Sequence, residues 1–252
     1  MGEQAALQDR PGVKILLNIP KGQMVEFCPW IRTGSLETRL LVTDLVHTLG
    51  RQTGPVSDKW RRRLAVWARK ERVVDQLAAD GTPLARFTKR LEEGEIWRLS
   101  FGTTAGSTSE YGLLVVTGPH ALCHFQLVGP RTFATCHSRR YPQMAPRLAH
   151  LRSIPVPNHP GYRLWLFLMN RGEGANDITL SRTRGNGRGE ATTVTLPPLG
   201  CRLVCLHRLF KTVGEGPACE RVFVKSVYPY DLYTLIESGS GPDGALSIQH
   251  IK

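Results

Sequence analysis

The sequence predicts an all-β protein of two related antiparallel β-sandwich modules that arose by internal duplication, with an N-terminal β extension. Three observations predict this fold class. Short runs of β-branched and apolar residues are separated by Gly, Pro and Asn turn signals about every 8 to 12 residues, which is typical of antiparallel sandwiches. The same order of strand-like blocks occurs twice along the chain. A chain of 252 residues is also long enough to bury two ordinary cores.

Four aligned blocks define the two copies of the strand pattern. The blocks begin at Arg63 and Arg163, at Val73 and Ile178, at Leu91 and Leu196, and at Tyr111 and Arg221, with Pro119 against Pro229. They occur in the same order in both copies, and the spacing between them drifts slowly. The alignment therefore predicts a first module over residues 59–142 and a second module over residues 158–252.

Residues 1–58 are predicted to be a loose arm followed by strands that complete the first module. Strand-like runs begin at Val13, Gln23 and Thr38, and turns that contain Gly or Pro separate them.

Residues 60–78 fit two descriptions. Trp60, Leu64 and Trp67 have nearly helical spacing, whereas residues 64–69 also alternate as a strand would. The match between residues 63–69 and residues 163–169 favours strands.

The second module is predicted from residues 161–210, which read as consecutive short strands interrupted by Gly, Pro and Asn clusters. Between the modules, residues 143–157 are rich in Pro and Arg. Because Pro favours extended backbone, this segment is predicted to be a connector that lies on the surface.

The order of strand, Asp-Gly or Asn-Gly turn, strand, Leu-Pro-Pro-Leu-Gly kink and Gly-Leu-Leu-Val-Val strand resembles bacterial immunoglobulin-like or fibronectin-like β-sandwich modules. The resemblance covers about two thirds of the chain. It implies a binding or structural scaffold and supplies no catalytic residues. Such modules are often extracellular, whereas residues 1–10 lack the basic segment and apolar run of a secretory signal. The sequence therefore favours a cytoplasmic protein.

The composition indicates a globular protein with a strong positive charge. Hydrophobic residues make up 41% of the chain, and the formal net charge is +12. The longest apolar stretch, residues 164–169, is too short to span a membrane. A protein partner or self-association is the expected mode of action. Nucleic acid is an alternative that the charge allows, and carbohydrate is another because sandwiches often present aromatic platforms.

A basic cluster with interleaved tryptophan is the first candidate site. Its phosphate-binding or acidic-partner-binding candidates are Lys59, Arg61, Arg62, Arg63, Trp67, Arg69, Lys70 and Arg72. Cations next to an aromatic ring can hold phosphates and stack a base. The alternative is an edge strand whose arginines are solvated and prevent edge-to-edge pairing.

The second candidate is a metal site in the first module, formed by His120, His124, Cys136 and His137. These residues flank a predicted hairpin that turns at Gly129-Pro130, and zinc prefers about four such ligands. The tightest register places Cys123 opposite Cys136 and His124 diagonal to His137. Neighbouring strand residues face apart, however, so buried thiols and surface imidazoles are the alternative, and we expect no cofactor.

The chain lacks sequence motifs of known catalytic sites, such as a nucleophile elbow, a phosphate loop or a dinucleotide fingerprint. The six cysteines are too few and scattered for a disulfide scaffold. Cys201 and Cys205 lie on one face of a predicted strand but about 13 Å apart, which predicts core thiols. The sequence therefore favours a non-enzymatic binding or structural subunit.

Overall fold

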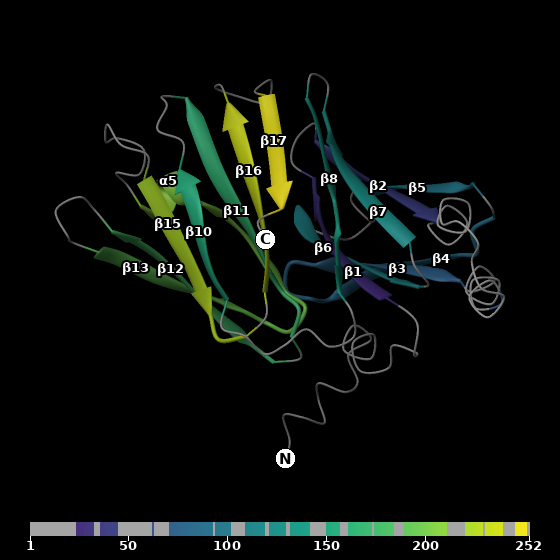
Figure 1. Cartoon of the computed structure of the whole chain (residues 1–252), viewed down its shortest axis with the longest axis horizontal. Coiled ribbons are helices and arrows are strands. Elements are labelled where there is room, and N and C mark those ends of the chain that lie inside the picture. The colour runs from purple at the N-terminus through teal and green to yellow at the C-terminus, as the bar shows by residue number, and fades with distance from the viewer. Residues whose placement is uncertain are drawn as a thin grey trace, which may run out of the picture.

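The structure, a computed structural model, describes residues 24–32, 36–44, 62, 71–92, 94–101, 109–118, 121–129, 132–141, 150–156, 161–172, 174–183, 189–210, 220–228, 230–238 and 245–250. Most of these residues lie in β-strands, and the strands of this part of the chain pair in antiparallel fashion (Figure 1). The predicted all-β class is therefore confirmed.

The first half of the chain forms a five-stranded sheet and a four-stranded sheet. The strand orders are β4-β3-β6-β1-β9 and β5-β2-β7-β8. The strands are β1 (Met24–Ile31), β2 (Glu37–Asp44), β3 (Arg72–Ala78), β4 (Pro83–Lys89), β5 (Ile96–Phe101), β6 (Tyr111–Gly118), β7 (Ala121–Val128), β8 (Phe133–His137) and β9 (Arg139–Tyr141).

The second half forms two four-stranded sheets, β10-β15-β12-β13 and β14-β11-β16-β17. Its elements are β10 (His150–Val156), β11 (Tyr162–Asn170), β12 (Asn176–Thr183), β13 (Gly189–Leu196), β14 (Cys201–Cys205), α5 (Leu206–Leu209), β15 (Glu220–Ser226), β16 (Tyr230–Ser238) and β17 (Ala245–His250).

The two halves have the same topology. When β9 is set aside, the orders β1-β6-β3-β4 and β5-β2-β7-β8 reappear as β10-β15-β12-β13 and β14-β11-β16-β17. Strands β1 to β8 therefore correspond, in chain order, to β10 to β17. The predicted pair of related sandwiches from an internal duplication is confirmed at the level of strand pairing.

The topology corrects one of the four aligned blocks. The counterpart of β11 is β2, so the match of residues 63–69 with residues 163–169 was wrong. Both stretches begin with Arg-Leu and continue with several apolar residues, but sheet neighbours decide which strands are equivalent. The other blocks pair β3 with β12, β5 with β14, and β6 with β15, as predicted. Residues 63–69 lie outside the described part of the chain. The neighbouring Arg62 is described, and it is helical.

The predicted connector over residues 143–157 also needs correction. Residues 150–156 form β10, which pairs with β15 and buries Ile154 and Val156 in the second core. Pro155 is tolerated because β10 is at the edge of its sheet. Alternation of inward Arg152, Ile154 and Val156 with outward neighbours was the strand signal that the proline content obscured.

The central strands β11 and β16 of the sheet β14-β11-β16-β17 are buried on both faces over most of their length. Leu166 and Leu168 of β11 pack in the second core, whereas Phe167 and Met169, on the opposite face, join the core of the first half. This explains why residues 164–169 are uniformly apolar. A strand covered on both sides has no solvent-facing positions, so it loses the polar alternation of a one-sided strand.

The two sandwiches meet through aromatic and backbone contacts. The rings of Tyr111 and Phe167 are 6.1 Å apart, and those of Phe125 and Tyr233 are 5.2 Å apart, both in edge-to-face geometry. The Cys201 amide donates a hydrogen bond to the Ala79 carbonyl at 2.8 Å. Strand β17 lies beside β8 (Figure 1). One continuous core therefore spans the junction between the sandwiches.

His207 in α5 gives the protein a pH-dependent stability. Its Nδ1 accepts a hydrogen bond from the Leu164 amide at 3.3 Å, and burial, followed by the charge of Arg163, lowers the His207 pKa below 6.5. The folded state therefore resists protonation, and stability present above pH 6.5 is lost as pH falls through and below that value.

We expect His207→Gln to reduce this loss, since glutamine keeps an acceptor but does not titrate. The effect should be below about 1 kcal/mol because the half-buried ring is screened by solvent. Thermal unfolding of both proteins between about pH 7.5 and pH 5 measures it. If the difference in Tm between the variant and the unchanged protein were the same at every pH in this range, His207 would be ruled out as the titrating group.

Candidate partner-binding surface

The structure describes only part of the predicted basic cluster. Arg62 is exposed, and the following residues lie outside the described part: Lys59, Arg61, Arg63, Trp67, Arg69 and Lys70. Arg72 opens β3 and is fully buried, so its place in an exposed cationic surface was wrong. The backbone explains the burial: the Arg72 side chain crosses Gly118, where an added Cβ would lie 2.9 Å from the Arg72 Cγ.

The register of the β7–β8 hairpin differs from the predicted one. Cys136 lies opposite Phe125, whereas we expected it opposite Cys123. The connection runs over residues 129–132 and is closed by a bond from the Gly129 amide to the Thr132 carbonyl at 2.8 Å. This loop is longer than the tightest turn assumed from the sequence. Loop length sets hairpin register, so the register shifts with it.

The corrected register separates the candidate metal ligands. His124 and His137 are direct cross-strand partners and share the outer face of their sheet. Cys136, paired with the buried Phe125, belongs to the inner face. His120 lies outside the described residues. Within the described part of the chain, no group of three or more His, Cys, Asp or Glu residues is arranged to hold a metal ion.

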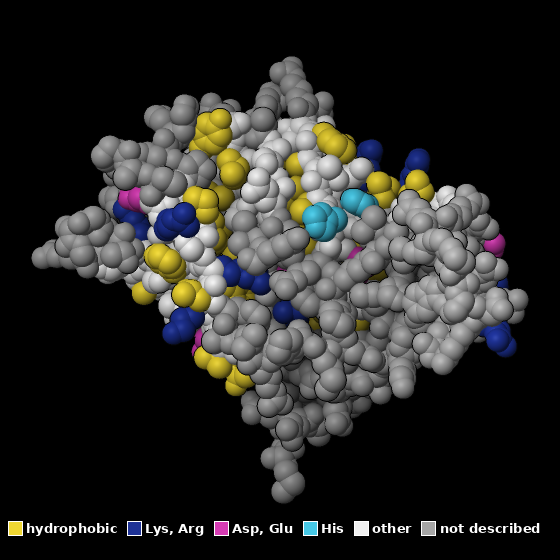
Figure 2. Space-filling view, viewed as in Figure 1, with side chains coloured by type: hydrophobic (Ala, Val, Ile, Leu, Met, Phe, Trp, Pro, Cys, Tyr) yellow, Lys and Arg dark blue, Asp and Glu magenta, His cyan; other side chains and the backbone are white. Residues whose placement is uncertain are grey.

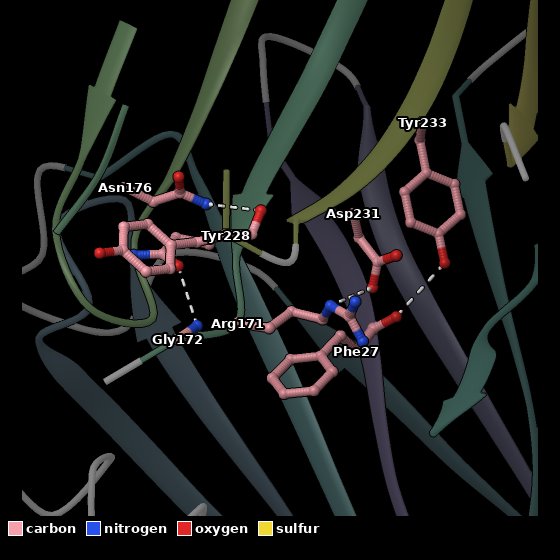
Figure 3. Close-up of polar contacts among 8 residues, drawn as sticks. Phe27, Arg171, Gly172, Asn176, Tyr228, Asp231 and Tyr233 are labelled. Atoms are coloured by element: carbon pink, nitrogen blue, oxygen red, sulfur yellow. Dashed lines mark hydrogen bonds and ion pairs between the residues drawn. The ribbon is translucent and has the colours of Figure 1, made fainter. Parts of the chain in front are cut away.

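Buried polar groups gather where the two sandwiches meet. In Figure 3, Arg171 and Asp231 point toward each other, with 3.6 Å between Nε and Oδ2, and the Tyr233 hydroxyl donates to the Phe27 carbonyl at 3.3 Å. Arg171 and Asp231 are almost completely buried. The Tyr233–Phe27 bond joins β16 to β1 and so helps to fix the sandwiches relative to each other. The Arg171–Asp231 pair lies within the second sandwich, between the end of β11 and β16.

A second buried group lies inside the first sandwich. The Ser138 hydroxyl donates a hydrogen bond to Glu26, and both residues are buried. Burial, and after it the charge of Glu26, raise the pKa of the Cys28 thiol well above its ordinary value. A thiol held protonated is a poor nucleophile and a poor metal ligand, so Cys28 acts as a core residue.

Three of the exposed large apolar side chains of the described chain belong to the edge strand β10 and to the turn that follows its neighbour β15. Leu151 is 64% exposed, Val227 72% and Tyr228 60%. Lys225 is the cross-strand partner of Leu151, and Arg221 lies further along β15 on the same face. We call these five residues the β10 edge surface. Figure 2 shows hydrophobic side chains beside Lys and Arg on the side of the molecule where β10 and β15 lie.

Hydrogen bonds hold the exposed turn of this surface in place. The Ser226 hydroxyl donates to the Asn176 side chain and accepts a bond from the Tyr228 amide at 3.2 Å. The Asn176 amide group donates to the Tyr228 carbonyl at 3.5 Å (Figure 3). The backbone that carries Val227 and Tyr228 is therefore fixed to β12. A fixed turn presents exposed side chains with little loss of entropy on binding.

Polar contacts also order the flat face beside this turn. Arg221 donates a hydrogen bond to the Ser153 hydroxyl at 3.0 Å. The half-buried Phe223 lies in register between Ser153 on β10 and Ser181 on β12. The Phe223 ring therefore lies among small side chains on the outer face of the sheet, and Arg221 and Lys225 flank it along β15.

Sequence reasoning missed this surface. Residues 150–156 were assigned to the connector, so Leu151 was not considered as part of a sheet. Val227 and Tyr228 were included in a continuous strand block, whereas β15 ends at Ser226 and the two residues form the following turn. The Val-Tyr-Pro-Tyr sequence was the available signal, because Pro cannot extend a central strand and a turn is the usual alternative.

Comparisons with known proteins identify no family for this chain: no protein-family model matches it, and no curated protein matches it. Within the described residues, no helix is long and apolar enough to cross a membrane.

Proposed function

We propose that this chain is a non-enzymatic, cytoplasmic β-sandwich subunit that binds another protein through the β10 edge surface. The observation that carries the proposal is that Leu151 on the edge strand β10, and Val227 and Tyr228 in the turn after its neighbour β15, are each 60% exposed or more. Grouped exposed apolar side chains with charged neighbours are typical of protein-binding sites, whereas single ones are ordinary.

The chemistry of the surface supports a protein partner. Tyr and Arg are enriched where binding energy concentrates in interfaces, and Tyr228 and Arg221 are both exposed here. The resemblance of the strand order to immunoglobulin-like and fibronectin-like scaffolds supports the same role. Strand sandwiches of this kind commonly bind through edges and turns that a rigid core positions.

Native purification from the source cell at low and high salt, followed by mass spectrometry, tests the proposal. We expect a stoichiometric protein partner that survives high salt, because apolar contacts strengthen rather than weaken as salt rises. The double variant Leu151→Asp/Tyr228→Ala should lower recovery of that partner at least about tenfold, since it removes two central apolar contacts.

Phe133→Ala is the matched control. Phe133 is also 60% exposed, but it lies on β8 of the first sandwich. It should retain the partner. Co-purification of nucleic acid that salt releases, with no protein partner, would contradict the proposal and favour the alternative of nucleic-acid binding.

A further inference from the structure

We infer that the partner adds a strand to the free edge of β10, and that the added strand is an extended acidic peptide segment. This inference rests on the proposed function and specifies how the partner is bound.

The first sandwich already contains a strand at the equivalent position. Strand β1 corresponds to β10, and β9 pairs with β1 on the side away from β6. Among the residues that the structure describes, β15 is the sole hydrogen-bonded neighbour of β10. Strand β1 would likewise have only β6 as a neighbour if β9 were removed. The same fold position is thus extended by one strand in the first copy, which shows that its geometry accepts an added strand.

The backbone of β10 directs hydrogen-bonding groups toward this free edge. Pro155 has no amide hydrogen, and it fits in a ladder with Arg221 when its nitrogen faces away from β15. Backbone direction alternates along a strand, so Ser153 and Leu151 also present their N–H and C=O groups outward. An added strand would pair with these groups, as in β-augmentation.

The charge next to this edge selects an acidic strand. Arg221 and Lys225 lie on β15, directly beside β10, and both are exposed. The neighbouring carboxylates are engaged within the sheet, because Glu220 accepts a bond from Arg182 and Asp177 accepts one from Thr195. A second copy of this chain would bring its own arginine and lysine to the edge, and its net charge of +12 opposes association.

In the first sandwich, the basic residues belong to the sequence of the added strand. Arg140 of that strand, β9, is the register partner of the buried Glu26. In the second sandwich the cations belong to the resident sheet, so complementarity requires the acids on the incoming strand. Side chains alternate between the two faces of a strand, so the residues between those acids would point to the inner face, which carries the buried Ile154 and Val156, and apolar residues fit there.

A synthetic eight-residue peptide that alternates valine and glutamate tests the inference directly, by fluorescence anisotropy against the full chain. We expect saturable binding that weakens but persists as salt rises, because salt screens the charge contacts and leaves the backbone pairing in place. Ser153→Pro removes an outward N–H and should weaken binding at least about tenfold. Ser153→Ala is the matched control, since it removes the hydroxyl that Arg221 contacts but keeps the amide, and it should bind within about twofold of the unchanged chain.

Charge reversal and competing ligands complete the test. Arg221→Glu/Lys225→Glu should weaken the glutamate peptide at least about tenfold and improve binding of the same peptide with lysine in place of glutamate. The inference is overturned if the unchanged chain does not bind the glutamate peptide at about 1 mM, or if Ser153→Pro binds it as well as Ser153→Ala does.

Single-stranded oligothymidylate is the competing ligand. The inference would also be overturned, in favour of nucleic acid, if this oligonucleotide bound more tightly than the peptide and lost binding with charge reversal but not with Ser153→Pro. None of these peptide results depends on the native partner. If the peptide fails while a protein still co-purifies through the β10 edge surface, the binding mode is wrong and the proposed function stands.

Discussion

Replacing Gly112 with alanine is expected to destabilise the protein by about 2–6 kcal/mol, a large effect for a single methyl group. Gly112 is the second residue of β6, and it lies between Trp30 of β1 and Ala78 of β3 in the sheet. A Cβ at this position would lie 2.0 Å from the Leu77 carbonyl oxygen and 2.5 Å from Trp30 Nε1. Neither the Leu77 carbonyl nor the buried Trp30 indole can make room for the methyl group unless the neighbouring strands also move.

The same methyl group would break a buried hydrogen bond. Trp30 Nε1 donates to the Leu77 carbonyl at 2.7 Å, directly over the Gly112 Cα. Trp30 is almost completely buried, so an indole N–H displaced from this carbonyl has no access to water. Leaving such a donor unpaired costs about 1–3 kcal/mol, in addition to about 1–3 kcal/mol for overpacking.

Urea denaturation followed by tryptophan fluorescence measures the effect. Gly174→Ala is the matched control, because no atom lies within 4 Å of the added Cβ and its φ angle is not in the left-handed region. The control should change the free energy of unfolding by less than about 0.5 kcal/mol. Equal stabilities of the two variants would mean that β1, β3 and β6 do not pack as closely as the structure indicates.

The glycine illustrates which parts of the fold the sequence predicts. Strands such as β3, β12 and β16 were recognised because apolar residues and turn signals set their positions locally. The close approach of Trp30 to Gly112 depends on residues 82 positions apart in the chain. A single sequence contains no signal for that approach, because it arises when two strands become neighbours in a sheet.

The candidate sites were less predictable for the same reason. Sequence composition identified Arg72 as a surface cation, and only the tertiary structure shows that the side chain is buried across Gly118. The hypothesis that Cys136 and His137 bind a metal depended on the register of the β7–β8 hairpin. The loop of that hairpin is longer than the sequence analysis assumed, and the register differs as a result. The β10 edge surface follows from where a strand ends, at Ser226, and strand ends are the least certain feature of a sequence-based prediction.

Removing the ring of Phe167 is expected to destabilise both sandwiches together, by about 3–5 kcal/mol. Phe167 is fully buried on the face of β11 that meets the first sandwich, and its ring contacts Tyr111 edge to face. The opposite face of β11 packs in the second core through Leu166 and Leu168. A cavity beneath Phe167 therefore weakens a strand that both cores share.

Hydrogen exchange of Phe167→Ala distinguishes a shared core from two independent ones. Amides of β6 in the first sandwich and of β12 in the second should lose protection by the same free energy, and unfolding should remain a single transition. Phe133→Ala is the control, since an exposed ring on β8 should change stability by less than about 0.5 kcal/mol. If β12 kept its full protection while β6 lost it, the sandwiches would be separate folding units. Joint loss would mean instead that the duplicated modules fold as one body, so that the β10 edge is held rigid by a core reaching across both halves.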